Sequence, residues 1–382
     1  MKQKHISIFL LIVLALSILV GCASEQPEAA TNVTTTSVAD STAVETPTAN
    51  SDSSETESND SSPEDQGPPA GGDMGAFNVD KSGDTELAAL IAETESKFQP
   101  YTYTDTETDL TLPYNLYLPD DYDPAKSYPM VVFIADMSVV GQDVTAPLEQ
   151  GYGGIIWASS EEQAKHESIV LVPEYPVTIL DDHGSYTMTD YVELTVRLIE
   201  SVSADYSVDT DRIYATGQSM GCMTFLYLAS EHPDLFAAEI FVSGQWDVTQ
   251  LDGIASQKSF YIVAEGDPGG SGGQEQLYDY LTAKGVEINL ANDWDAQWSE
   301  SEFDAAVSDI LSQSSSTLYF ANFKVGSTLP EDVAEGTSEH MYSFDYAYKI
   351  EGVRDWLFKQ TKATPETGEA TTTADATPAI VA

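Results

Sequence analysis

The sequence predicts an α/β fold, a mainly parallel twisted sheet with helices on both faces. Short runs of consecutive apolar residues alternate with segments whose apolar residues recur at helical spacing. Continuous apolar runs such as Met130–Ala135 and Ile169–Val172 are typical of parallel strands covered on both faces. Strands that alternate with helices favour a parallel sheet. Because most hydrophobic residues lie between Leu87 and Phe358, the core is expected there.

The expected elements follow in chain order. Apolar residues alternate over residues 110–118, which predicts a half-buried strand, and Pro113 indicates a position near a sheet edge. The buried strands expected after it are Met130–Ala135, Ile169–Val172, Arg212–Thr216, Ile240–Ser243 and Phe260–Ala264. The helices expected are residues 191–202, Met220–Ser230, Gln274–Lys284, a helix opening at Ser299 with Glu302 as its capping partner, and Tyr346–Phe358.

The N-terminus has the pattern of an export signal. Two lysines precede Ile6–Val20, an apolar run shorter than the roughly 20 residues that a spanning helix needs. Leu19-Val20-Gly21-Cys22 then resembles the lipobox of bacterial lipoproteins, which implies removal of residues 1–21 and a lipid on the Cys22 thiol. The alternative is a plain secretory signal with an incidental cysteine. We expect a lipid-anchored protein on the extracytoplasmic face of the cell membrane.

Composition indicates which partners are excluded and which part of the chain folds. With 63 acidic and 15 basic residues the net charge is −48, which argues against nucleic acid or a polyanionic substrate as partner. Residues 22–75 are rich in Ser, Thr and acidic residues and are expected to be a disordered tether, as is the tail 361–382. The folded domain is expected over residues 76–360. If Cys22 is lipidated, Cys222 has no disulfide partner.

Residues 217–221, Gly-Gln-Ser-Met-Gly, match the pattern G-x-S-x-G. They follow an expected strand and open an expected helix, which is the setting that a nucleophile elbow requires. The alternative, a chance glycine-rich turn, does not explain this setting. Ser219 is therefore the candidate nucleophile.

The base and the acid are expected to follow the nucleophile in the order serine, acid, histidine. Only His232 and His340 come after Ser219; His232 ends the helix that the serine opens, where it is expected to cap it, so His340 is the candidate base. The acid should close the strand Phe260–Ala264, where Asp267 is the first choice. Glu265 and Asp247 are the alternatives. The acid would hold the imidazole tautomer and stabilise the imidazolium.

Several segments together resemble one branch of the α/β-hydrolases, that of poly(3-hydroxybutyrate) depolymerases and feruloyl esterases, often labelled predicted peptidases. They are YNLYLPDDYDPAKSYPMVVFI, GYGGIIWAS, IVLVPEYP, DTDRIYATGQSMG, HPDLFAAEIFVSG and EGVRDWLFKQ, within residues 86–360. The resemblance implies an eight-stranded hydrolase sheet and supports Ser219, Asp267 and His340 in their roles.

An oxyanion hole needs two backbone N–H groups. The expected donors are Met220, directly after the serine, and Met137, in the loop after the strand Met130–Ala135. Many relatives have His-Gly where this chain has Ala135-Asp136. This departure puts the geometry of the loop in doubt, but a main-chain donor survives substitution.

Aromatic residues near the expected site are candidate substrate contacts: Trp157, Tyr175, Trp246, Trp294 and Trp298. The last two lie in a small insert between acid and base, which could form a cap over the site. The alternative is that these rings pack the insert onto the sheet.

These observations predict a serine hydrolase that cleaves carboxylic esters through an acyl-enzyme, acting on a small or polysaccharide-linked ester. The alternatives are a serine peptidase of the prolyl-oligopeptidase type and a ligand-binding lipoprotein without catalysis. No cofactor or metal is expected, since the chain lacks an H-E-x-x-H motif and a Cys/His ligand cluster.

Overall fold

The computed structural model describes residues 79–182, 184–331, 333–334 and 336–362. The expected signal peptide, the lipidation site Cys22, the tether 22–75 and nearly all of the tail lie outside these residues. Within them, no helix has both the length and the apolar character needed to cross a membrane.

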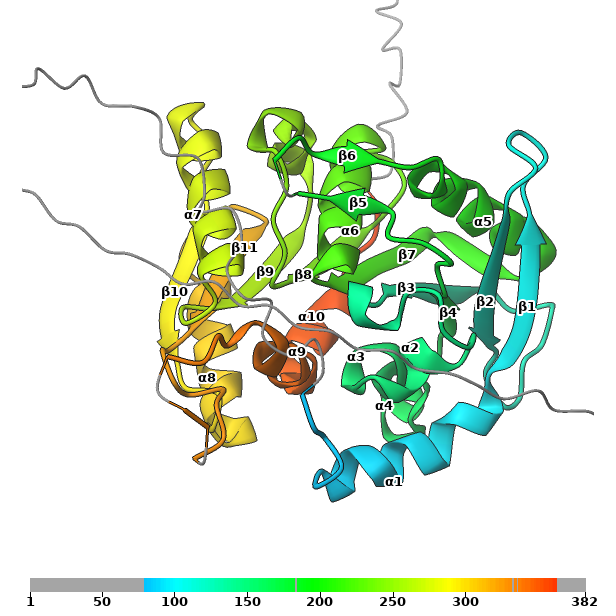
Figure 1. Ribbon diagram of the computed structural model, residues 1–382, viewed down its shortest axis with the longest axis horizontal. Coiled ribbons are helices and arrows are strands. Elements are labelled where there is room, and N and C mark those ends of the chain that lie inside the picture. The colour runs from blue at the N-terminus through cyan, green and yellow to red at the C-terminus, as the bar shows by residue number, and fades with distance from the viewer. Residues whose placement is uncertain (1–78, 183, 332, 335, 363–382) are drawn as a thin grey trace, which may run out of the picture. The chain divides into compact units, whose positions relative to one another are not determined.

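A nine-stranded sheet forms the centre of the described part of the chain (Figure 1). Its strand order is β1-β2-β4-β3-β7-β8-β9-β11-β10, and the seven strands from β4 to β10 run parallel. The strands are β1 Gln99–Thr104, β2 Thr111–Tyr117, β3 Tyr128–Ile134, β4 Ile169–Pro173, β7 Val208–Gln218, β8 Ala238–Val242, β9 Ser259–Ala264, β10 Asn289–Trp294 and β11 Leu318–Phe323. A separate hairpin pairs β5 Leu180–Asp181 with β6 Thr187–Met188.

Helices cover both faces of this sheet (Figure 1). One face packs against α5 Tyr191–Asp205, α6 Met220–Glu231 and α7 Pro268–Ala283. The other packs against α1 Thr85–Thr94, α3 Tyr152–Ile155, α8 Glu300–Leu311, α9 His340–Lys349 and α10 Glu351–Phe358. The remaining helices are short: α2 Ala146–Glu149, α4 Ser160–Lys165, η1 Glu95–Lys97, η2 Met137–Val139, η3 Ile156–Ala158, η4 Val248–Gln250 and η5 Asp252–Ser256. The predicted α/β class is confirmed.

The strands expected from apolar runs are all present, with boundaries that differ by a few residues. The antiparallel strand β2 lies second from the edge, in agreement with the position expected from Pro113. The edge strand β1 was not predicted because its side chains are almost all exposed, so it carries no apolar pattern. At the other edge, β10 is a ninth strand where the family resemblance implied eight.

Two helix predictions were wrong in extent. The helix expected at Gln274–Lys284 begins six residues earlier, at Pro268, although four glycines occupy its first turns. Glycine disfavours helices on its own, but Gly270 and Gly273 lie so close to neighbouring side chains that a Cβ would clash. The last helix, expected as Tyr346–Phe358, is two helices, which meet at Ile350 in an extended conformation.

The insert between acid and base supplies β10 and α8. The predicted capping box of Ser299 and Glu302 is present, and Phe303, Val307 and Ile310 are buried. These side chains join the core on the α9 and α10 side of the sheet. The insert therefore extends the sheet and covers its face, as the packing alternative expects.

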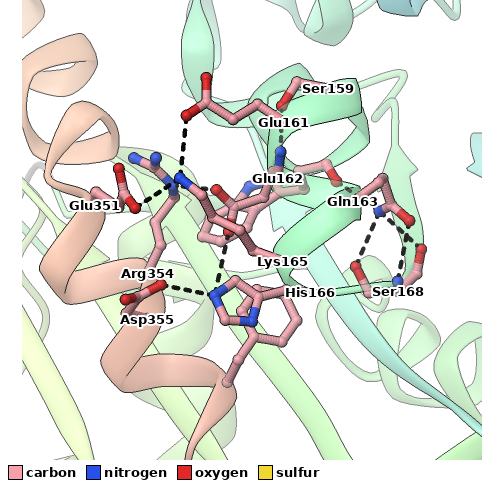
Figure 2. Close-up of polar contacts among 12 residues, drawn as sticks. Ser159, Glu161, Glu162, Gln163, Lys165, His166, Ser168, Glu351, Arg354 and Asp355 are labelled. Atoms are coloured by element: carbon pink, nitrogen blue, oxygen red, sulfur yellow. Dashed lines mark hydrogen bonds and ion pairs between the residues drawn. The ribbon is translucent and has the colours of Figure 1, made fainter.

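A buried ion pair between Glu162 and Arg354 joins α4 to α10 (Figure 2). Helix α10 directly follows α9, the helix that begins with His340. The Nε of Arg354 donates to Oε2 of Glu162 at 2.8 Å, and its Nη1 donates to the carbonyl of Tyr348 at 2.5 Å. Glu162 is 2% exposed and Arg354 is 8% exposed. Around them, Lys165 bonds Glu351 at 2.6 Å, nearer the solvent.

Arg354→Met is expected to destabilise the protein by about 3–5 kcal/mol, because it leaves the Glu162 carboxylate buried without its partner. Urea unfolding followed by circular dichroism measures this change. Lys126→Met is the matched control, since its pair with Glu167 is exposed to solvent and contributes little to stability. Adding Glu162→Leu to Arg354→Met should restore much of the lost stability. Equal effects of Arg354→Met and Lys126→Met would contradict the role of the buried pair.

Candidate active site

Ser219 lies in a tight turn between the end of β7 and the start of α6. Its backbone has φ 49° and ψ −113°, a conformation that is strained for a residue with a side chain. Gly217 and Gly221, two positions before and after Ser219, are needed for a steric reason. A Cβ at Gly221 would lie 2.0 Å from the carbonyl oxygen of Ile134, and one at Gly217 would lie 2.5 Å from the backbone of Gly221. The predicted elbow is therefore present, held by close backbone packing.

Three side chains that are distant in sequence form a hydrogen-bonded chain at this turn. The Nε2 of His340 is 2.9 Å from Oγ of Ser219, and its Nδ1 is 2.7 Å from Oδ2 of Asp267. Ser219 and Asp267 directly precede α6 and α7, and His340 is the first residue of α9. All three helices begin at the carboxyl edge of the parallel strands.

Asp267 contacts the imidazole, and the two alternative acids do not. It is 3% exposed, and the absence of a side chain at Gly270 leaves room for its carboxylate, since a Cβ there would lie 2.5 Å from Oδ2. The Asp247 carboxylate instead accepts hydrogen bonds from Thr249 and Gln250. Glu265 lines a cavity described below.

The surroundings of His340 favour its charged form. Burial by itself lowers the pKa of an imidazole, but the hydrogen bond and charge of Asp267, together with the charges of Asp136 and Asp182, outweigh this and raise the pKa of His340 above 6.5. The imidazolium that forms when a histidine takes a proton from serine is thus stabilised in this site.

Glu339, which sequence reasoning missed, anchors the segment before the base. Its carboxylate accepts a hydrogen bond from the Gly326 N–H at 2.6 Å and from the Thr328 hydroxyl at 2.6 Å, and it is 1% exposed. Its own N–H donates to the carbonyl of Gly266, one residue before the acid. In so acidic a chain, no local signal distinguishes this carboxylate from solvated ones.

The two expected oxyanion donors are each the first residue of a helix. Met220 is the first residue of α6, and Met137 is the first residue of η2, after β3. First-turn N–H groups have no acceptor within their own helix, and we find no acceptor for either one in the described part of the chain. They are thus free to bind an oxygen anion.

Comparison with known proteins gives the family. The model of the Esterase family, described as "Putative esterase", matches residues 106–309, more than half of the chain, and this range includes Ser219 and Asp267. The chain belongs to this esterase family. The predicted α/β-hydrolase fold and the resemblance to esterases are confirmed. No curated protein matches the sequence.

Comparison with solved structures gives a similar fold in one case. The crystal structure of a thermostable esterase superposes with a TM-score of 0.56 and 23% identity, over 70% of this chain and 64% of that one. This chain therefore spans less than two thirds of the length of that esterase. A feruloyl esterase module from Clostridium thermocellum gives a TM-score of 0.43 at 15% identity, over 67% and 88% of the two chains. An S-formylglutathione hydrolase from Staphylococcus aureus gives 0.41 at 14%, over 68% and 98%.

Two of the aromatic residues expected to contact substrate lie in the core of the protein. Trp157 is fully buried; its Nε1 donates to the carbonyl of Gly153, and its ring lies 6.2 Å from that of Phe358. Tyr175 is 3% exposed, and its hydroxyl bonds Thr195 at 2.6 Å. Both predictions were wrong, because the segments that follow these strands turn inward against helices.

The other three aromatic candidates are also packed against neighbouring rings. Trp294 and Trp298 both contact Phe303 of α8, with ring centroids 6.1 and 5.6 Å away, so they hold the insert on the sheet, and the packing alternative is correct for them. Trp246 is 3% exposed beneath Tyr186, with ring centroids 5.2 Å apart, and therefore has little surface to offer a substrate.

A cavity of about 710 Å³ lies at the start of α7, beside β10 and β11. Its lining includes Glu265, Gln274, Tyr278, Asn292 and Asn322, and none of the three triad residues. Among the described residues, no group of three or more His, Cys, Asp or Glu side chains is arranged to hold a metal ion.

Proposed function

We propose that this protein hydrolyses carboxylic esters through an acyl-enzyme on Ser219. The observation that carries the proposal is the continuous hydrogen-bonded chain from Ser219 through His340 to Asp267. A serine hydroxyl is a weak nucleophile unless a base takes its proton, and this arrangement supplies the base and holds it in the required tautomer.

The proposed reaction has two steps. In the first, Oγ of Ser219 attacks the ester carbonyl while His340 takes its proton; the imidazolium then protonates the leaving alcohol, and the acyl group stays on Ser219. In the second, His340 takes a proton from water, which attacks the acyl-enzyme, and Ser219 recovers its proton as the acid leaves. The N–H groups of Met137 and Met220 would bind the oxyanion in both steps. Asp267 keeps its charge and stabilises the imidazolium.

A fluorophosphonate probe followed by peptide mass mapping tests the nucleophile. Covalent labelling at Ser219 is expected, and a protein that is not labelled there would support the alternative of a ligand-binding lipoprotein. Initial rates with p-nitrophenyl acetate, methyl ferulate and a peptide p-nitroanilide then test the substrate class. We expect turnover of the two esters; preferential cleavage of the anilide would instead support a peptidase.

We further propose that the protein is held outside the cytoplasmic membrane by a lipid on Cys22. The apolar run before the cysteine and the residues Leu19-Val20-Gly21 support this. Because the protein has a net charge of −48, its surface would not adhere to anionic head groups, so the lipid would carry the attachment.

Cys22→Ala is expected to move the protein from the detergent phase to the aqueous phase in a Triton X-114 partition of expressing cells. The physical reason is the loss of acyl chains, each of which contributes about 0.8 kcal/mol per buried methylene. Cys222→Ala is the matched control, since this thiol is fully buried. Detergent-phase recovery of a Cys22→Ala variant from which residues 1–21 have been removed would rule out the lipid anchor.

A further inference from the structure

The loop after β3 carries a buried carboxylate, Asp136, directly before the expected oxyanion donor Met137. Asp136 is 1% exposed and caps η2: its Oδ1 accepts a hydrogen bond from the Ser138 N–H at 2.8 Å. Its Oδ2 accepts one from Nε2 of Gln218 at 2.9 Å. One carboxylate therefore joins the residue after Met137 to the residue before Ser219.

A second connection closes this contact into a ring. The Nε2 of Gln218 also donates to Oε1 of Gln150 at 2.9 Å, and Nε2 of Gln150 donates to Oγ of Ser138 at 2.7 Å. The ring thus contains both sequence neighbours of Met137, which are Asp136 and Ser138. At Gln218 it reaches the nucleophile elbow. Gln218 is 2% exposed, so these bonds lie largely out of water.

The bonds of this ring depend on a carboxylate at position 136. A glycine at position 136 could accept no side-chain hydrogen bond, whereas a carboxylate accepts one from each of two segments. Charge-assisted bonds of this kind are about twice as strong as neutral ones. Both Asp136 oxygens are engaged by donors, so neither is left as an unpaired buried acceptor near the oxyanion.

We propose that Asp136 is a positioning residue, which, through Gln218, fixes the Met137 N–H at the distance from Ser219 that the oxyanion requires. This inference rests on the proposed esterase function. The expected effect is large because a displacement of about 1 Å at a reacting centre costs on the order of 10²-fold in rate. Loss of one oxyanion donor costs about 10²–10³-fold in kcat.

Asp136→Asn tests the proposal in the full chain. With p-nitrophenyl acetate we expect kcat to fall by about 10²-fold with little change in KM, since the oxyanion contact is made in the transition state. The affinity for a trifluoromethyl ketone inhibitor should fall by the same factor as kcat/KM. Asp143→Asn is the matched control, because it removes the same charge from an exposed side chain of the same loop, and it should leave both constants unchanged.

The pH profile of the same variant separates positioning from general damage to the fold. The charged groups that face His340 are Asp267, Asp136 and Asp182, and all three raise its pKa. Because the neutral imidazole is the active form, removing the Asp136 charge should move the acid limb of kcat/KM to lower pH. Gln218→Met removes the same contact without a charge change, so kcat should fall while the acid limb stays in place.

The possible results distinguish a failure of this inference from a failure of the proposed function. An Asp136→Asn or Gln218→Met variant with kcat within twofold of wild type would overturn the positioning role while Ser219-dependent hydrolysis stands. A wild-type protein without Ser219-dependent hydrolysis would overturn the proposed function instead. If Asp136→Asn does not fold, as judged by circular dichroism, the result with Gln218→Met decides.

Discussion

Ser219→Ala is expected to lower kcat for ester hydrolysis by about 10⁶-fold, which is the scale measured when a triad serine or histidine is removed. The structural reason is that Oγ of Ser219 is the atom His340 contacts at 2.9 Å. The variant should keep its fold, because the backbone at this position keeps two hydrogen bonds. The Ser219 N–H donates to the carbonyl of Val242, and the Ser219 carbonyl accepts from the N–H of Met223. Steady-state kinetics and fluorophosphonate labelling measure the loss.

His340→Ala should cost about as much, and the double variant should be no worse than either single one, since the two groups act as a unit. Ser256→Ala is the control, an exposed serine whose hydroxyl bonds only the carbonyl of Gly253. Substantial hydrolysis by Ser219→Ala, with labelling at another residue, would refute this assignment of the nucleophile.

Asp267→Asn is expected to lower kcat by about 10⁴-fold, because an amide at this position favours the wrong imidazole tautomer and no longer stabilises the imidazolium. The pH dependence should also change. The Asp267 hydrogen bond and charge raise the pKa of His340, so their loss lowers it. Since the neutral imidazole is the active form, the acid limb of kcat/KM should move to lower pH. A pH series of kcat/KM measures both effects.

Asp247→Asn and Glu265→Gln are the matched controls for the acid. The first carboxylate is bonded to Thr249 and Gln250, and the second lines the cavity beside α7, so both variants should stay within a few-fold of wild type. A larger loss of turnover in either control than in Asp267→Asn would identify a different acid.

Several features of the candidate site could be predicted because they follow from local rules. The strand, the glycine-flanked serine and the helix are contiguous in sequence, and the steric need for Gly217 and Gly221 applies to any such turn. Chain order then left His340 as the base and Asp267 as the first choice of acid, and in the structure His340 contacts both Ser219 and Asp267.

Other features depend on contacts between segments far apart in the chain. Asp136 and Gln218 are separated by 82 positions, and Glu339 meets Gly326 and Thr328 through a loop of irregular backbone. A carboxylate has the same sequence signal whether it is solvated or buried between two donors. Trp157 and Tyr175 show the same limit, because an aromatic side chain near a strand end can face either the site or the core.

The class of fold, the elbow and the order of the triad could all be predicted from residue patterns, since they depend on apolar periodicity and on turns of a few residues. The tertiary structure alone decided which carboxylates are buried partners, that α7 begins among glycines, and that the insert extends the sheet and covers its face. The physical reason is that burial and hydrogen-bond partnership belong to pairs of segments, and only the packed chain brings those pairs together.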